Sequence, residues 1–366
     1  MKKTKYLAAC IAAVMALLII GCGSGDDGID YDAEKWAIAG TTVFRYTGAE
    51  ADVRVPDGVT VIGESAFTSR GGVVTSVTLP ESVKIIEDRA FYGCARLASV
   101  KMPAGLAMLR DSAFENCTSL KSVTIPASVV LIGEGTFRGC TSLESVTIPD
   151  SVKSIGWGAF YNCTSLASVT IGEGVERIVN AAFSGCTSLK SVTIPDSVVS
   201  IGQEAFSRCT SLVSVTIGEG VERIGPQMFE NCTSLASVTI PGSVEYIGWG
   251  AFQNCKSLES VEIPGSVTSI RFSAFQNCTN LASVTIPDSV ESIEEKAFYW
   301  CESLESVKIG VGVKSIGDEA FNVCYKLTKV NYGGTAEQWK EIGIGSNAFP
   351  GGAKITDKDG KEISNS

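Results

Sequence analysis

The chain has 366 residues, of which 45% are hydrophobic and 19% are charged, and its formal net charge is −10. The apolar fraction suffices for a continuous core, and no basic cluster offers the positive surface that nucleic-acid binding requires. The chain contains no histidine, so the commonest general base and the commonest zinc ligand are both missing.

Residues 1–22 have the order of charged and apolar residues that is typical of an export signal. Three lysines within the first five residues precede an apolar run from Leu7 to Ile20, which is too short for a comfortable membrane span. The run ends in Gly21-Cys22 and resembles a bacterial lipobox, which predicts Cys22 as the lipidated first residue of the mature chain. An ordinary cleaved signal with a chance cysteine, or an uncleaved anchor, is the alternative.

The acidic, glycine-rich residues 23–30 are predicted to be a flexible tether. Residues 31–52 differ from the sequence that follows, and residues 37–46 indicate two short strands around a glycine-containing turn. A stacked array needs an end cap with a polar outer face, so we expect residues 31–52 to be the N-terminal cap.

Residues 53–330 are dominated by a repeat of 23 residues. Phe recurs at this interval from Phe91 to Phe321, and a Cys follows each Phe three residues later, from Cys94 to Cys324. An unbroken period of this size predicts a stacked solenoid, because one such unit cannot bury its own apolar residues.

Each unit combines two local patterns. Val169 and Ile171 alternate with polar residues, which predicts a half-buried strand, and Pro or Gly after such strands ends the pairing. A weaker extended piece follows, and Phe183 and Cys186 then return at helical spacing, which indicates a compact helical turn. About thirteen rungs, from Val53 to Tyr332, would give a sheet roughly 60 Å long at ~4.8 Å per strand.

The pattern Leu-x-x-Val-x-Ile-Pro-x-Ser-Val-x-x-Ile-Gly-x-x-Ala-Phe-x-x-Cys resembles the treponemal-type leucine-rich repeat of the BspA-like family. The segment Tyr332–Trp339 is similar to the C-terminal end of that family. The resemblance implies a curved, right-handed leucine-rich repeat solenoid, mainly β with short helical turns. It also implies a bacterial envelope protein, often lipid-anchored and exposed on the outer membrane. Some members bind host matrix proteins such as fibronectin and fibrinogen, or other cells, and the family has no catalytic residues to carry over.

Residues 331–366 are predicted to form the C-terminal cap. Thr335 with Gln338 three residues later is a capping box, which predicts a short helix. Residues 354–363 indicate a hairpin that turns at Asp359-Gly360. Together these elements would cover the last edge of the sheet.

The eleven repeat cysteines all occupy one inward slot of the unit. Stacked rungs would place successive thiols about 5 Å apart, near enough for disulfides. Their odd number and shared slot favour packing as small hydrophobic residues, and a tetrahedral metal site needs ligands that converge from different elements. We therefore expect neither a metal nor another cofactor.

Two columns of hydroxyl side chains should face solvent on the concave sheet. Their regular part is Ser168, Ser191, Ser214 and Ser237 beside Thr170, Thr193, Thr216 and Thr239. They could bind a protein or glycan partner, because solenoids bind through extended faces. The alternative is that Thr simply suits an exposed strand and Ser is tolerated there.

Trp249 and Phe272 occupy the same slot in neighbouring units, Trp157 occupies it earlier, and Tyr246 lies close by in sequence. Exposed aromatic residues can mark a partner site. Isolated surface aromatic residues that lie along a turn need no such explanation, so both interpretations stay open here.

The combined prediction is a lipid-anchored cell-surface protein for adhesion, which binds a protein or glycan, including extracellular matrix proteins, and contacts the membrane only through its anchor. The alternative is a structural or periplasmic scaffold with no host ligand. An enzyme is disfavoured, because the chain lacks histidine and any insertion that could form a cleft. Ice or crystal-surface binding, which the Thr column raises, is disfavoured because leucine-rich arrays curve and splay their columns.

Overall fold

The computed structural model describes residues 32–363. The predicted signal peptide, the predicted lipidation site Cys22 and the tether lie outside the described residues. Ala33–Ser366 forms one compact unit. Among the described residues, no helix has the length and apolar character to cross a membrane.

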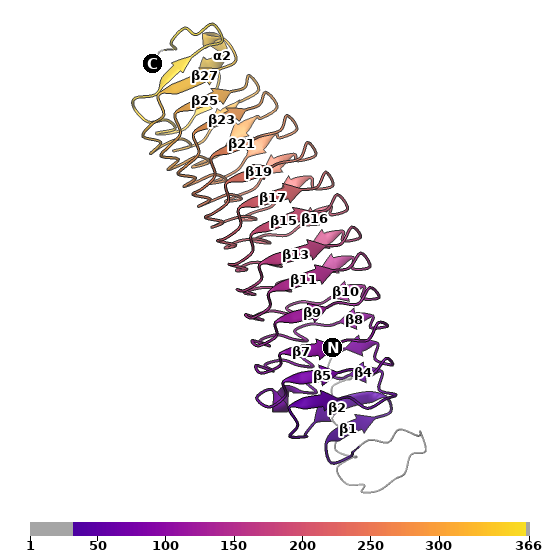
Figure 1. Ribbon diagram of the computed structural model, residues 1–366. Coiled ribbons are helices and arrows are strands. Elements are labelled where there is room, and N and C mark those ends of the chain that lie inside the picture. The colour runs from indigo at the N-terminus through magenta and orange to yellow at the C-terminus, as the bar shows by residue number, and fades with distance from the viewer. Residues whose placement is uncertain (1–31, 364–366) are drawn as a thin grey trace, which may run out of the picture. The chain divides into compact units, whose positions relative to one another are not determined.

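The long-strand face is a stack of parallel strands, one from each unit (Figure 1). Neighbouring strands pair in register with a shift of one repeat, so that Ser145 lies beside Ser168 and Thr147 beside Thr170. The stack is assigned as three successive sheets, β3 to β7, β9 to β13 and β15 to β29. The strands are β3 (Asp52–Arg54), β5 (Ser76–Thr78), β7 (Ser99–Lys101), β9 (Ser122–Thr124), β11 (Ser145–Ile148), β13 (Ser168–Ile171), β15 (Ser191–Ile194), β17 (Ser214–Ile217), β19 (Ser237–Thr239), β21 (Ser260–Glu262), β23 (Ser283–Ile286), β25 (Ser306–Ile309), β27 (Lys329–Tyr332) and β29 (Lys354–Thr356).

The short-strand face is formed by the second extended piece of each unit. Each strand here has two residues, of which the second is an Ile or Leu that is buried except in β16, where Ile201 is half-buried, and in the last strand, where Ile344 is exposed. The strands are β4 (Val61–Ile62), β6 (Ile85–Ile86), β8 (Met108–Leu109), β10 (Leu131–Ile132), β12 (Ser154–Ile155), β14 (Arg177–Ile178), β16 (Ser200–Ile201), β18 (Arg223–Ile224), β20 (Tyr246–Ile247), β22 (Ser269–Ile270), β24 (Ser292–Ile293), β26 (Ser315–Ile316) and β28 (Gly343–Ile344).

The third side of each unit is a chain of tight turns that contains the repeated Phe. The compact turn that the sequence predicts is present, but its backbone N–H groups donate alternately to the next unit and within their own unit. Phe160 N–H donates to the next unit at Ala182 (2.8 Å), whereas Tyr161 N–H donates within its own unit to Gly158 (2.9 Å). The alternation arises because Gly158 (φ 55°) and Asn162 (φ 56°) adopt left-handed conformations. This side therefore forms a third hydrogen-bonded ladder between units, with one short 3-10 helix, η1 (Thr68–Arg70), in the first of them.

A column of parallel Phe rings fills the core. From Phe67 to Phe321 the rings stack on their neighbours with centroids 4.6 to 5.8 Å apart, and Phe349 adds a last ring 5.2 Å from Phe321. Leu, Val, Ile and Cys of each unit surround the rings and are buried. Offset stacking and apolar burial together hold one unit on the next.

The N-terminal cap is the expected pair of strands, β1 (Trp36–Ala39) and β2 (Thr42–Tyr46), which pair antiparallel around Gly40. Trp36 and Tyr46 cover the first Phe ring, so the apolar column does not end in solvent. Tyr46 donates its hydroxyl proton to Glu50. Burial and this hydrogen bond raise the pKa of Tyr46 to about 12.

The C-terminal cap contains helix α2 (Ala336–Lys340), which begins with the predicted capping box of Thr335 and Gln338. The predicted hairpin turns at Gly360 (φ 76°), and a single antiparallel bridge joins Thr356 to Glu362. Its first strand, β29, also pairs parallel with β27 and makes a fourteenth long strand, one more than the sequence predicted.

Candidate functional site

The two predicted hydroxyl columns lie on the long-strand face and are exposed, from Ser168 and Thr170 to Ser237 and Thr239. Ser191, Ser214 and Ser237 are register partners in three paired strands, and so are Thr193, Thr216 and Thr239. The alternation places Val192 and Ile194 inward, which fixes the hydroxyl groups outward. This face can therefore offer hydrogen bonds to a partner at every rung.

One interruption divides these columns. Strand β13 is the end of one sheet and β15 begins the next, so no strand ladder joins Ser168 to Ser191. A backbone hydrogen bond from Lys190 to Ala167 (3.3 Å) still connects the two units just before the strands. The hydroxyl surface thus has two segments. They meet between Ser168 and Ser191, which both belong to the predicted binding residues.

The predicted aromatic residues lie away from the hydroxyl columns. Tyr246 belongs to β20 on the short-strand face, and Trp249 and Phe272 are in the turns that follow β20 and β22. Trp249 is 41% and Phe272 36% exposed, whereas Tyr246 is half-buried. The predicted partner-binding residues therefore occupy two separate surfaces.

Two arginines that the sequence analysis did not select contact Tyr246. The guanidinium carbon of Arg271 lies 4.8 Å from the centre of the Tyr246 ring, and that of Arg223 lies 5.7 Å from it. Cation–π contacts of this kind hold an aromatic ring in place at a surface. Arg223 precedes Tyr246 by one repeat and is its register partner in the neighbouring strand. The 23-residue period could therefore have predicted this contact.

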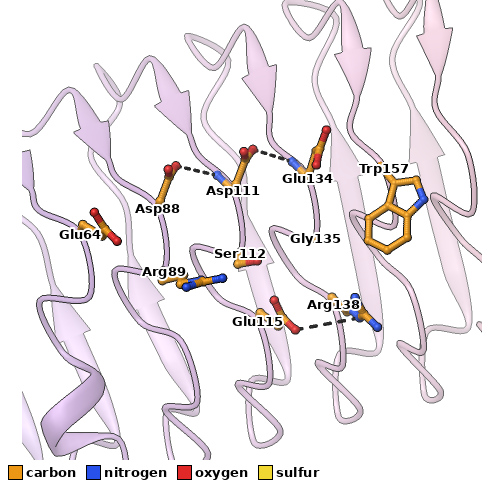
Figure 2. Close-up of a pocket in the computed structure, with 10 residues that line it drawn as sticks. All are labelled: Glu64, Asp88, Arg89, Asp111, Ser112, Glu115, Glu134, Gly135, Arg138 and Trp157. Carbon is orange, nitrogen blue, oxygen red and sulfur yellow. Dashed lines mark hydrogen bonds and ion pairs between the residues drawn. The ribbon is translucent and has the colours of Figure 1, made fainter. Parts of the chain in front are cut away.

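A charged groove of about 360 Å³ lies along the turns that follow β4 to β12 (Figure 2). Five carboxylates and two arginines line it, and Trp157 stands at its end. Arg138 stacks on Trp157 with 5.4 Å between its guanidinium carbon and the ring centre. The sequence analysis treated recurring carboxylates as a surface pattern and did not find this groove.

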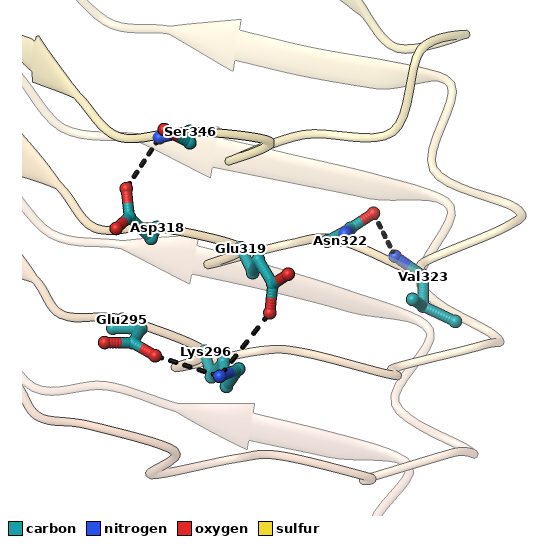
Figure 3. Close-up of polar contacts among 7 residues, drawn as sticks. All are labelled: Glu295, Lys296, Asp318, Glu319, Asn322, Val323 and Ser346. Carbon is teal, nitrogen blue, oxygen red and sulfur yellow. Dashed lines mark hydrogen bonds and ion pairs between the residues drawn. The ribbon is translucent and has the colours of Figure 1, made fainter.

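The last units replace hydroxyl groups by lysine and asparagine side chains. Lys308 and Asn331 stand in the Thr column, and Lys329 stands in the Ser column. On the turn side, Lys296 contacts Glu295 (2.9 Å) and Glu319 (3.5 Å) in Figure 3. These two carboxylates raise the pKa of Lys296, chiefly through the hydrogen bond that Lys296 donates to Glu295.

The repeat cysteines pack inside the core as predicted, and all eleven are free and buried. Each thiol donates to the carbonyl of the Phe in the preceding unit, as Cys163 does to Phe137 (3.1 Å). Burial raises the pKa of Cys163 and Cys209 to about 12, so these thiols stay protonated at neutral pH. Within residues 32–363, no group of three or more Cys, Asp or Glu side chains is arranged to hold a metal ion.

Comparison with known proteins identifies the repeat. A family model described as the BspA type leucine-rich repeat region matches residues 38–166, 153–282 and 248–357. No curated protein matches the chain.

Several solved bacterial structures are similar. A leucine-rich cell surface protein from Faecalibacterium prausnitzii is 29% identical, with 88% of this chain and 98% of that one covered and a TM-score of 0.50. A leucine-rich repeat protein from Bacteroides ovatus is 24% identical, with 92% and 100% covered and a TM-score of 0.57. The pneumococcal vaccine antigen PcpA is 20% identical, with 88% and 90% covered and a TM-score of 0.51. The last two likenesses show the fold alone.

Proposed function

The chain belongs to the BspA-type leucine-rich repeat family, and on that basis we propose that it is a bacterial cell-surface protein that binds a protein or glycan through its long-strand face. The observation that carries the proposal is the pair of exposed hydroxyl columns, which stay in register over successive rungs. A partner that contacts several rungs gains affinity from many weak hydrogen bonds, each worth about 1 kcal/mol. The F. prausnitzii relative, described as a cell surface protein, supports the proposed location.

The proposal includes a lipid anchor at Cys22, with residues 23–30 as the tether to the array. Its support is the charge and apolar order of the first 22 residues. Metabolic labelling with palmitate tests this part directly. Label should enter the wild-type chain and be lost in Cys22→Ala, and label that survives the substitution would refute the anchor.

The binding proposal is tested by placing lysines in the Thr column. Lys308 occupies this slot in a paired strand, so Thr170→Lys, Thr193→Lys and Thr216→Lys keep a side chain that the fold accepts. The matched control is Ser200→Lys on the short-strand face, where Arg177 occupies the neighbouring slot. The mature chain without lipid is screened against immobilised matrix proteins and glycan arrays, and each variant is then titrated against the ligands found.

We expect the triple lysine variant to weaken binding at least about tenfold, a loss of about 1.4 kcal/mol, while Ser200→Lys leaves it unchanged. Binding that resists all three lysines would refute the long-strand face as the binding surface. Protection of the array from added protease on intact cells would refute surface exposure and favour the periplasmic scaffold.

A further inference from the structure

The short-strand face has an outward column that is aliphatic only in the first part of the array. Its members, here called the apolar stripe, stand at one outward slot of successive strands from β4 to β10: Val61, Ile85, Met108 and Leu131. From β12 to β18 the same slot holds Ser154, Arg177, Ser200 and Arg223, and Tyr246 and Ser269 follow in β20 and β22. The fold therefore does not require an apolar side chain at this slot.

The apolar stripe is accessible to solvent. Leu131 is 39% exposed, and Val130 beside it is 49% exposed. Val61, Ile85 and Met108 are half-buried by their neighbours in the column. A contiguous apolar surface of this kind on a soluble array marks a contact surface, whereas single exposed apolar residues do not.

An acidic border accompanies the stripe. The slot two residues after the buried Ile or Leu of β4 to β10 holds Glu64, Asp88, Asp111 and Glu134, here called the acidic row (Figure 2). The same slot holds Trp157 in the next unit and Asn180 and Gln203 after it. The unbroken run of carboxylates therefore ends at the same unit as the apolar stripe, although Glu295 and Asp318 occupy this slot again near the C-terminal end.

Backbone hydrogen bonds position two carboxylates of the acidic row. Asp88 and Asp111 accept hydrogen bonds from the backbone N–H groups of Asp111 (3.2 Å) and Glu134 (2.8 Å), which hold their carboxylates at the rim of the groove. Arg138 in the groove is already paired with Glu115. Among the described residues, no salt bridge engages the four carboxylates of the row.

We propose that the first units of the array, from β4 to β10, bind an amphipathic basic segment of a partner protein. Its apolar side chains would cover the apolar stripe, and its lysines or arginines would lie along the acidic row. The inference goes beyond the binding surface proposed above, because it concerns the short-strand face. The stripe spans three strand spacings, about 14 Å, which matches a helix of roughly 10 residues.

Charge decides between this occupant and two others. A second copy of the chain carries the same acidic row and a net charge of −10, so two copies would bring like charges together. Bilayers with anionic headgroups would meet the same repulsion. The acidic row attracts a basic segment, whereas it repels the other two occupants.

The probe for the test is a synthetic helical peptide of roughly 14 leucine and lysine residues with all leucines on one face. The stripe variant is Met108→Ser with Leu131→Ser, since serine fills the same slot at Ser154 and Ser200. The border variant is Asp88→Asn with Asp111→Asn, because Asn180 accepts the equivalent backbone hydrogen bond from Gln203 (3.1 Å). The matched control is Arg177→Ser, which changes the stripe's slot beyond its end.

The peptide should bind the wild-type chain, and the stripe variant should raise its Kd at least about tenfold. The border variant should lower the salt dependence of Kd, and Arg177→Ser should leave Kd unchanged. The lysine variants of the Thr column should also bind the peptide normally, which separates this surface from the long-strand face.

Three results would overturn the proposal. One is a Kd that is equal in the wild-type chain and the stripe variant, or no peptide binding at all. Another is a dimer in sedimentation equilibrium that the stripe variant dissociates, which would assign the stripe to a second copy. The third is adsorption of the wild-type chain, but not the stripe variant, to phosphatidylglycerol vesicles.

Discussion

The repeated units and the two ends of the array are held by different side chains. In the middle, Phe206 stacks between two rings, Phe183 and Phe229, and Cys209 donates its thiol proton to the preceding unit at Phe183 (3.3 Å). At the ends, larger aromatic residues cover the column instead, Trp36 and Tyr46 at one end and Trp339 at the other.

This difference shows what the repeat needs and what it leaves open. A middle unit must match the unit before it and the unit after it, so its inward slots are nearly invariant. An end unit has one neighbour and must turn a polar or aromatic surface to the other side. Outward side chains need neither match the neighbouring units nor cover an end of the array. The residues of the apolar stripe and the hydroxyl columns can therefore differ between units.

The largest expected effect is a pH-dependent loss of stability in the thiol-containing units. The caps contain no cysteine among the described residues, so this effect distinguishes the units from the caps. A folded thiol pKa raised from 9.0 to about 12, as at Cys163, stabilises the fold fully below pH 9, and this stabilisation is lost as pH rises toward 12. Each such thiol lowers the unfolding free energy by roughly 1 kcal/mol per pH unit in that window.

The prediction is therefore a steep loss of stability between pH 9 and pH 10 in reducing buffer, measured by urea unfolding followed by circular dichroism. Removal of two thiols in Cys209→Ala with Cys232→Ala should make the slope with pH visibly shallower. A free energy of unfolding that does not change from pH 8 to pH 10 would contradict the thiol argument.

The second prediction compares a middle ring with the last one. Phe206→Ala should lower the free energy of unfolding by about 3–5 kcal/mol, because Phe206 is fully buried and two rings lose a neighbour. Phe349→Ala should cost clearly less, since Phe349 is half-buried and its stacked neighbour lies on one side only. Equal losses in chemical denaturation would mean that stacking between units does not control stability.

The smallest expected effect concerns the left-handed residue two positions after the repeated Phe. Asn277 (φ 60°) fills this slot in a middle unit, but Val323 (φ 61°) fills it in the last regular unit. A β-branched residue is strained there, although Asn322 accepts the Val323 N–H (2.9 Å, Figure 3). Val323→Gly should stabilise the chain by about 1 kcal/mol, and Asn277→Gly should change little.

Thermal unfolding of the two variants tests this prediction. A melting temperature that falls in Val323→Gly would show that the side chain contributes packing that outweighs the strain.

The fold was predictable because its signals recur. The alternation around Val169 and Ile171, the Phe and Cys period and the capping box at Thr335 each act through local geometry, and the structure confirms them. The hydrogen-bond alternation in the turns was not predictable from helical spacing. It depends on left-handed residues, and the left-handed slot two residues before Phe is filled by side chains as different as Ala181 and Glu204.

The candidate surfaces were predictable only in part. Strand alternation placed Ser191 and Thr193 outward, but the separation of Tyr246 and Trp249 from these columns depends on which side of the solenoid each segment occupies. The apolar stripe escaped notice because it appears only when the residue before each buried Ile is compared along the column, as from Ile85 to Ser154. A repeat pattern averaged over all units hides such a change.

The hydrogen-bond ladder on the turn side affects what happens when a protease cleaves the chain. Backbone hydrogen bonds join neighbouring units on three sides, as in the bonds from Phe160 to Ala182 (2.8 Å) and from Asn162 to Ser184 (2.8 Å) on the turn side. A protease that cleaves one exposed turn breaks the covalent chain, but the ladders and the ring column still join the two fragments. A nicked molecule would therefore keep both of its outer surfaces, and fragments made separately would each present a complete edge on which the other can assemble.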